Sequence, residues 1–156
     1  AVSQLRAASA ALAALRNEMQ SLAASLPEYP VVMGMFGVGP ALGPQLMAEI
    51  GDVRRFHSKK ALVAFAGIDA PPYQSGQMEV RSRSISKRGS SALRRTLFLV
   101  MSVILQRSPT DNPVYQFMDR KRTEGKPYRV YMIASANKFL RIYYAAVKKY
   151  LDSLEA

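Results

Sequence analysis

The chain contains no cysteine and only one histidine, His57, among its 156 residues. Without cysteine it can form neither disulfides nor thiolate metal sites, which is compatible with a reducing cytosol. A single histidine excludes multi-histidine zinc sites and disfavours a histidine-based catalytic triad. No apolar run reaches the roughly 20 residues that a membrane-spanning helix needs, so a membrane is not among the expected partners.

Acidic residues are scarce: 11 Asp and Glu stand against 22 Lys and Arg, which gives a formal net charge of +11. This excess of positive charge predicts a polyanionic partner, and nucleic acid is favoured over a membrane surface. Because 49% of the residues are apolar, the chain can bury a core. Its length is typical of one compact domain with an appended helix.

No acidic residue occurs between Glu79 and Asp111, and this stretch begins with cations placed just before an apolar helical segment. The cations are Arg81, Arg83, Lys87, Arg88, Arg94 and Arg95. Cations at a helix N-terminus oppose the positive end of the helix dipole, so an anion bound there would explain them. We therefore predict that all six contact nucleic-acid phosphates, the last four foremost. The alternative is a solvated basic surface.

Residues 2–26 are rich in Ala and Leu and carry apolar residues at a 3-4 spacing through three heptads. The stripe consists of Leu5, Ala8, Leu12, Leu15, Met19, Leu22 and Leu26, and Pro27 follows it. One interpretation makes residues 1–27 the end of a coiled coil, which implies a homo-oligomer. The other is an amphipathic helix packed on its own domain.

Residues 31–51 have the pattern of a helix-hairpin-helix motif, in which Gly37 and Gly39 form the hairpin and Pro40 begins the second helix. Glycine permits positive φ and close backbone approach, and proline suits the first helical position. In such a motif the hairpin N–H groups hold a DNA phosphate without reading sequence. The alternative is an ordinary tight turn between packed helices.

Four further helices are predicted, at residues 59–66, from Ser90 or Ser91 to about 107, from the loop at 108–113 to 124, and at 127–151. Ser58 and Gly67 are the expected caps of the first. The second is apolar almost all round, which is typical of a central core helix. On the last, Lys138, Arg141 and Lys148 share one face, and the inward stripe consists of Ile133, Leu140, Tyr144, Val147 and Leu151. The predicted fold is therefore mainly α: a helical domain containing a helix-hairpin-helix, preceded by a coiled-coil-like N-terminal helix. A short β-hairpin within 73–86 is the one strand structure considered.

Several short strings follow one another in order between Val31 and Leu105. They are Gly37-Val38-Gly39-Pro40, Ala48-Glu49-Ile50-Gly51-Asp52, Arg55-Phe56, Ala64-Phe65-Ala66-Gly67, Tyr73-Gln74-Ser75-Gly76, and Ile85-Ser86-Lys87-Arg88-Gly89 with Leu93-Arg94-Arg95. In this order and spacing they resemble the C-terminal half of the insertion-sequence one-ten and one-eleven-eleven transposases, a family that includes the Piv-type DNA invertases. The segment around Gly125-Lys126-Pro127 matches the family's tail more loosely.

The resemblance implies a DNA transposase or recombinase in which this chain supplies a catalytic serine, Ser75. Family members join such a half, through a coiled coil, to an N-terminal RuvC-like half that carries four acidic metal ligands. The chain has no counterpart of that half, so we expect a fragment that is inactive alone, with its divalent metal (Mg²⁺) bound elsewhere. The resemblance also implies DNA as partner, a structured guide (bridge) RNA in some members, and a cytoplasmic prokaryotic protein that joins the nucleoid when bound to DNA. Residues 28–156 would form the transposase domain, with the serine loop and basic run at 73–95 and a helical tail at 108–156.

The residues alone do not single out Ser75, because other serines are close by: Ser82, Ser84, Ser86, Ser90 and Ser91. A serine hydroxyl needs a base, a metal or an electropositive site to become a nucleophile. His57, Asp69 and Glu79 offer no convincing base, which fits a composite site. Two functions from other classes stay open: a non-catalytic nucleic-acid-binding module, and an assembly domain whose charge serves solubility.

Overall fold

The computed structural model describes residues 1–70 and 84–156, which form seven α-helices and one 3-10 turn and contain no strand. The helices are α1 (Val2–Ala24), α2 (Tyr29–Met33), α3 (Leu42–Ile50), α4 (Lys59–Phe65), α5 (Ser91–Arg107), α6 (Pro113–Thr123) and α7 (Tyr128–Leu154), with the 3-10 turn η1 (Val53–Arg55) between α3 and α4. The prediction of a mainly α fold is confirmed. The hairpin considered within 73–86 falls almost wholly outside the described residues.

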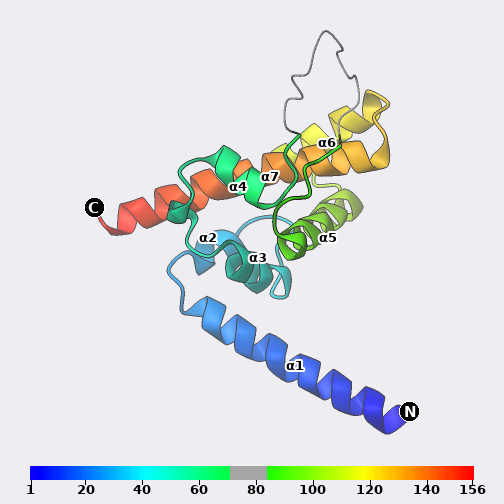
Figure 1. The fold of residues 1–156 in the computed structure, drawn as a ribbon, viewed down its shortest axis with the longest axis vertical. Coiled ribbons are helices and arrows are strands. Elements are labelled where there is room, and N and C mark those ends of the chain that lie inside the picture. Colours follow the sequence, from blue (N-terminus) through cyan, green and yellow to red (C-terminus); the bar gives the residue numbers. More distant parts are fainter. Residues whose placement is uncertain (71–83) are drawn as a thin grey trace.

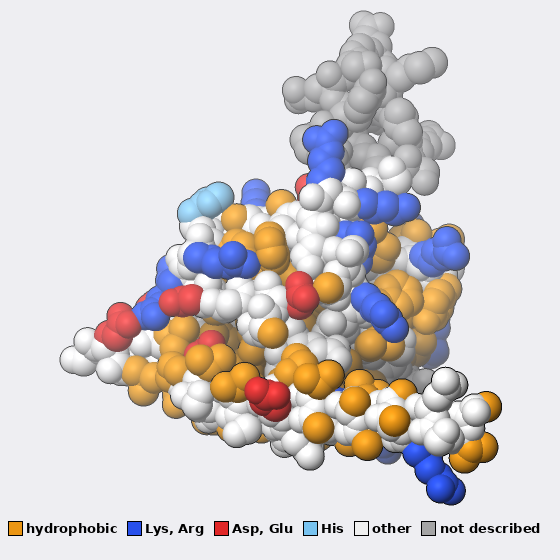
Figure 2. All heavy atoms as spheres, turned by 60° about the horizontal axis from the view of Figure 1, so that its bottom comes forward, with side chains coloured by type: hydrophobic (Ala, Val, Ile, Leu, Met, Phe, Trp, Pro, Cys, Tyr) orange, Lys and Arg blue, Asp and Glu red, His pale blue; other side chains and the backbone are white. Residues whose placement is uncertain are grey.

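Helix α1 projects away from the other helices, and its N-terminal end is far from them (Figure 1). Ala23, near its C-terminal end, is its only buried residue. The large side chains of the predicted stripe are all exposed, from 37% for Met19 to 68% for Leu5. Figure 2 shows hydrophobic side chains along the rod at the lower edge of the view. The interpretation of α1 as a helix packed along its own domain is therefore not what the structure shows.

The remaining helices surround α5 and α7, which supply most of the core. On α5 the side chains of Leu93, Leu97, Val100, Met101 and Ile104 are at most 1% exposed, so the predicted core helix is confirmed. On α7 the predicted inward stripe is buried, apart from the partly buried Ile133. Helices α3, α4 and α6 pack against this pair, as the crossing ribbons in Figure 1 show.

The region of the predicted helix-hairpin-helix consists of α2, a turn and α3. Gly37 adopts φ +83°, as expected of a hairpin glycine. Helix α3 begins at Leu42 rather than at Pro40, but the N–H of Gly43 donates to the carbonyl of Gly39 and so closes a turn around Pro40. No helix among the described residues is both long enough and apolar enough to cross a membrane.

Candidate nucleic-acid interface

The segment that carries Ser75 is closed at its base by hydrogen bonds between residues on either side of it. The N–H of Ser86 donates to the carbonyl of Asp69 at 2.9 Å, and its hydroxyl donates to the Asp69 carboxylate at 2.5 Å. The N–H of Lys87 donates to the carbonyl of Gly67 at 3.0 Å. We call helices α2 to α7 and their connections the body. These bonds fix the two points at which the segment is attached to the body. Ser75, Arg81 and Arg83 themselves lie outside the described residues.

Close backbone contact between the end of α4 and the start of α5 makes this closure possible. A side chain on Gly89 would place its Cβ 1.9 Å from the carbonyl oxygen of Phe65, so only glycine fits there. Gly67, at φ +65°, caps α4 as the sequence predicts. The N–H of Ser90 donates to the Phe65 carbonyl at 2.7 Å, satisfying one of the carbonyls that a helix end leaves unpaired.

Ser90 is the N-cap of α5, and it links that helix to α3. Its hydroxyl oxygen accepts a hydrogen bond from the Leu93 N–H at 3.0 Å and donates to the Glu49 carboxylate at 2.8 Å. The cap thereby orients the first two turns of α5, which carry Arg94 and Arg95. Because the Ser90 hydroxyl both donates and accepts a hydrogen bond within the protein, Ser90 is also a poor candidate for the nucleophile.

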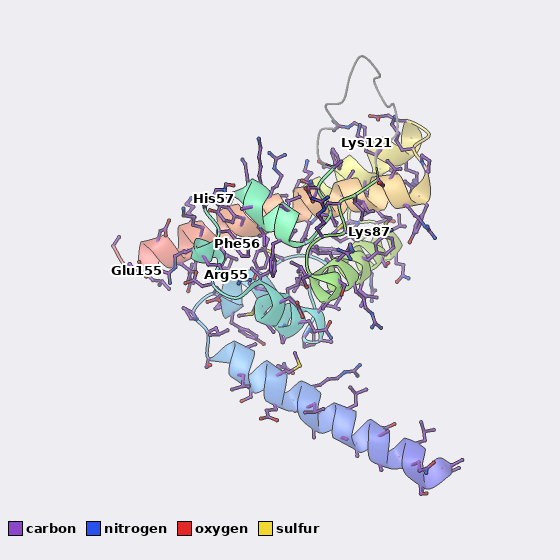
Figure 3. All side chains as sticks on the ribbon, in the orientation of Figure 1. Arg55, Phe56, His57, Lys87, Lys121 and Glu155 are labelled. Carbon is purple, nitrogen blue, oxygen red and sulfur yellow. The ribbon has the colours of Figure 1, made fainter. Side chains whose placement is uncertain are left out.

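The described cations of the basic run surround the start of α5, but they differ in solvent exposure and in hydrogen bonding. Lys87, in the loop that leads into α5 (Figure 3), adopts φ +53°, a left-handed conformation that strains a lysine, and its side chain is exposed. Arg88 and Arg95 are also exposed. Arg94 is half-buried and donates to the carbonyl of Ala66 at 3.0 Å. Part of the Arg94 guanidinium therefore holds the end of α4, and three cations face solvent.

Arg95 also lines a cavity of about 670 Å³ between α1, α3 and α5. Arg16 of α1 and Glu49 of α3 are among the other residues in its wall. The cavity brings a cation of the N-terminal helix to the same place as one from the basic run. Sequence reasoning did not foresee this approach, because it depends on how α1 meets the body.

The two hairpin glycines have different surroundings. A Cβ on Gly37 would lie 2.8 Å from the side chain of Ile104 and 3.2 Å from the carbonyl oxygen of Val100, so Gly37 allows the turn to pack against α5. Gly39 has open space where its Cβ would be. Packing accounts for Gly37, whereas Gly39 leaves the backbone accessible. The contact of either glycine with a phosphate stays a prediction.

Arg55, Phe56 and Phe65, which belong to the strings quoted above, form one packed cluster near η1 (Figure 3 labels the first two). The guanidinium carbon of Arg55 lies 4.6 Å and 4.8 Å from the centres of the Phe56 and Phe65 rings, a cation–π arrangement. The Arg55 Nε also donates to the carbonyl of Ile50 at 2.9 Å. These side chains tie α3 to α4 and so support the base of the Ser75 segment.

Titratable groups in the described part of the chain are dispersed. No three Asp, Glu or His side chains in residues 1–70 and 84–156 are grouped as a metal site would require. The hydrogen bond from Arg54 lowers the pKa of Asp52 at the surface. Burial, and then the charge of Glu28, raise the pKa of Tyr143 in the core. Asp52 and Tyr143 both lie apart from the cations around α5.

Fold and site together define a basic domain, helical throughout residues 1–70 and 84–156 apart from its turns and loops, that gathers a group of cations around the start of α5 and exposes the apolar stripe of α1. The sequence pattern described as the Transposase IS116/IS110/IS902 family matches residues 29–116, more than half of the chain. The chain belongs to this family. The matched range includes the base of the Ser75 segment, the basic run and α5.

Individual relatives agree with this assignment. The chain is 31% identical over 134 residues to the pilin gene-inverting protein of Moraxella bovis, covering 85% of this chain and 38% of the relative. It is 29% identical over 119 residues to an insertion element IS900 protein of Mycobacterium paratuberculosis, covering 76% of this chain and 29% of the relative. It is 33% identical over 81 residues to the transposase of insertion sequence element IS1111A of Coxiella burnetii, covering 52% of this chain and 22% of the relative. The chain thus spans well under half the length of these relatives.

Proposed function

We propose that this chain is the DNA-binding and serine-bearing part of a DNA transposase or recombinase. The observation that carries the proposal is the family match over residues 29–116, which includes Ser75 and the whole basic run. The closed base at Asp69 and Ser86 supports it, because a nucleophile must be presented from a fixed position beside the groups that bind its substrate.

In the proposed reaction the Ser75 hydroxyl oxygen attacks a scissile DNA phosphorus. A bond forms between that oxygen and phosphorus, the bond from phosphorus to one deoxyribose oxygen breaks, and the serine proton passes to a base. One DNA strand is then joined to the protein through a phosphodiester. Attack by the released deoxyribose oxygen of another strand reverses these bond changes and frees the serine. Lys87, Arg88 and Arg95 would offset the negative charge on the phosphate oxygens.

The described residues do not fit a divalent metal site, because their carboxylates are not grouped. We propose that the metal ligands and the base belong to a RuvC-like half outside the printed sequence. The coverage of the relatives, at most 38% for those described, supports this. The exposed stripe of α1 supports a coiled coil and a homo-oligomer. A guide RNA is a further proposed partner, on the family resemblance.

A second candidate function is site-specific DNA inversion, which is favoured by the two pilin gene-inverting proteins among the relatives, from Moraxella bovis and Moraxella lacunata. Inversion and transposition share the strand-cutting chemistry and differ in which DNA ends are joined. An assay of the full-length protein on plasmids with inverted sites separates the two by the product formed.

Trapping the covalent adduct tests the serine. The full-length protein that contains this chain is incubated with its metal and a nicked DNA substrate. After cleavage the short strand with the released deoxyribose oxygen dissociates, so the attack that would free the serine cannot occur. Ser75→Ala should abolish both the adduct and strand exchange while leaving DNA affinity within about twofold, because phosphate contacts elsewhere dominate binding. Ser84→Ala, beside the same segment, serves as the matched control and should keep both. Peptide mass spectrometry that maps the adduct to another serine or to a tyrosine would refute the choice of Ser75.

A further inference from the structure

A second basic surface lies between α6 and α7, away from the start of α5. The two helices enclose a groove of about 880 Å³. Its basic wall comes from Arg120 of α6 and from Lys138, Arg141 and Lys149 of α7. Its floor is apolar, with Phe117 as its only aromatic residue. None of the described residues that line it is acidic.

The groove continues toward the segment that carries Ser75. A second hollow, of about 500 Å³, shares Asn137 and Arg141 with the first and extends to Lys60 of α4. Its wall ends at Asp69 and Ala70, where the described chain stops before residue 84. The two hollows therefore form one path that runs from α6 along α7 to the closed base described above. We call this path the α6–α7 groove.

The charge of the groove is poorly balanced by the protein itself. Within residues 1–70 and 84–156, Lys60, Lys138, Arg141 and Lys149 take part in no ion pair. Asp69, the one carboxylate that residues 1–70 and 84–156 contribute to the path, accepts a hydrogen bond from Ser86. Like charges gathered in this way repel one another, and the repulsion is relieved when an anion binds among them.

Phe117 gathers cations around one aromatic ring. The charged groups of Arg120, Lys121 and Lys138 lie 5.3, 5.8 and 5.1 Å from the ring centre. Glu124 supplies one negative charge, 2.7 Å from Lys121 and 3.9 Å from Arg120, and Lys138 has no carboxylate partner among the described residues. An apolar floor with an aromatic side chain and cationic walls is the arrangement by which proteins bind unpaired nucleic acid.

We propose that the α6–α7 groove binds an unpaired DNA strand and leads it toward the segment that carries Ser75; this inference rests on the proposed function. Phosphates would lie against the lysines and arginines, and bases against the apolar floor. A duplex, whose bases are stacked inside, would leave that floor unused. Among the described wall residues, Asn137 is the one uncharged polar side chain that could bind a ribose 2′-hydroxyl. The groove therefore has few groups with which to select RNA over DNA.

The length of the groove suits a short strand. Residues 134–149 of α7 extend about 22 Å at the helical rise of about 1.5 Å per residue. At a stacked spacing of about 3.4 Å per nucleotide, this accommodates about six nucleotides. Small side chains at Ala134, Ala145 and Ala146 leave the floor low along this distance.

The test measures binding of the whole chain to a labelled oligothymidylate of about ten nucleotides and to a duplex of the same length, at several salt concentrations. The variant Lys138→Gln/Arg141→Gln/Lys149→Gln removes three groove cations. The matched control, Arg107→Gln/Lys126→Gln/Arg129→Gln, removes three cations that do not line the groove. Circular dichroism checks that both variants are folded.

We expect the groove variant to bind the oligothymidylate at least about tenfold more weakly and to reduce its salt slope by about two units, at about 0.7 per phosphate contact. Duplex affinity and the control variant should change much less. Phe117→Leu keeps apolar bulk but removes the ring, so it should weaken single-strand binding without changing the salt slope. If the triple variant is unfolded, the exposed Arg141→Gln alone must lower the slope by about 0.7.

The proposal would be overturned if the groove and control variants lost oligothymidylate affinity equally, or if neither lost any. It would also be overturned by an oligouridylate that binds the parent chain more tightly than DNA and loses that affinity in the groove variant, because the groove would then belong to RNA. If the parent binds duplex DNA while its single-strand affinity ignores the groove, this inference fails and the proposed function stands. A parent chain that binds neither form of DNA defeats both.

Discussion

The two longest helices, α1 and α7, have similar apolar periodicity but opposite environments. Helix α7 buries ten residues against α2, α4, α5 and α6, whereas α1 buries only Ala23. The apolar periodicity of the sequence shows that each helix has an apolar face. Whether other helices of the same chain cover that face depends on the tertiary packing. The stripe of α1 therefore needs a surface that the body does not provide, and a second copy of the stripe is the simplest match.

The largest effect is expected from breaking the stripe of α1. We expect the chain to self-associate and Leu12→Asp/Leu15→Asp to make it monomeric, because each leucine buried in a seam contributes about 1.5–3 kcal/mol. Ala10→Asp/Asn17→Asp places the same charges on the opposite face and should leave association intact. Sedimentation equilibrium measures the mass. A monomeric parent would show that the stripe contacts something other than a second copy.

A single core truncation in α7 is expected to have the next largest effect. Leu140 is fully buried, so Leu140→Ala should lower the free energy of unfolding by about 2–5 kcal/mol. Leu12→Ala lies in α1, outside the core formed by α2–α7, so it should change the free energy of unfolding of those helices by less than about 0.5 kcal/mol, whatever it does to association. All eight tyrosines lie outside α1 and there is no tryptophan, so tyrosine fluorescence in urea reports on the body alone. Similar losses for both variants would mean that α1 and the body unfold as one unit.

The smallest effect concerns the helix caps. Ser90→Ala should destabilise the body by about 1 kcal/mol, because the N-cap bond of α5 and the link to Glu49 are both lost. Ser25→Ala at the end of α1 removes one exposed bond to the Leu22 carbonyl and should cost less than about 0.5 kcal/mol. Urea unfolding followed by tyrosine fluorescence compares them. A larger loss for Ser25→Ala would show that the junction of α1 with the body is more important than its exposure indicates.

Local signals in the sequence were sufficient for most of the fold. Ser58 and Ser90 cap α4 and α5 through their own backbone neighbours, and Gly67 ends α4, so these boundaries follow from residues close in sequence. The start of α7 was predicted within one residue, although the helix continues to Leu154. Such features depend on short-range hydrogen bonds, which a single sequence encodes directly.

The arrangement of the candidate site was less predictable, because it depends on contacts between distant residues. Gly89 has to be glycine because of a carbonyl in α4, and Arg94 binds the end of that helix while its sequence position suggested only a phosphate. The α6–α7 groove likewise joins Phe117 to Lys138 across two helices. Sequence noted cations on one face of α7 but could not show what that face lies against. Ser75 owes its selection to the family resemblance.

The bonds between Asp69 and Ser86 also have a consequence for engineering. They join positions 17 apart in sequence, and none of residues 70–85 takes part in these bonds. The entropic cost of closing a connecting segment rises by only about 0.6 kcal/mol per doubling of its length. The junction therefore offers a fixed attachment point for segments of other lengths and sequences. We expect a chimaera that exchanges residues 70–85 between family members to fold as its recipient does.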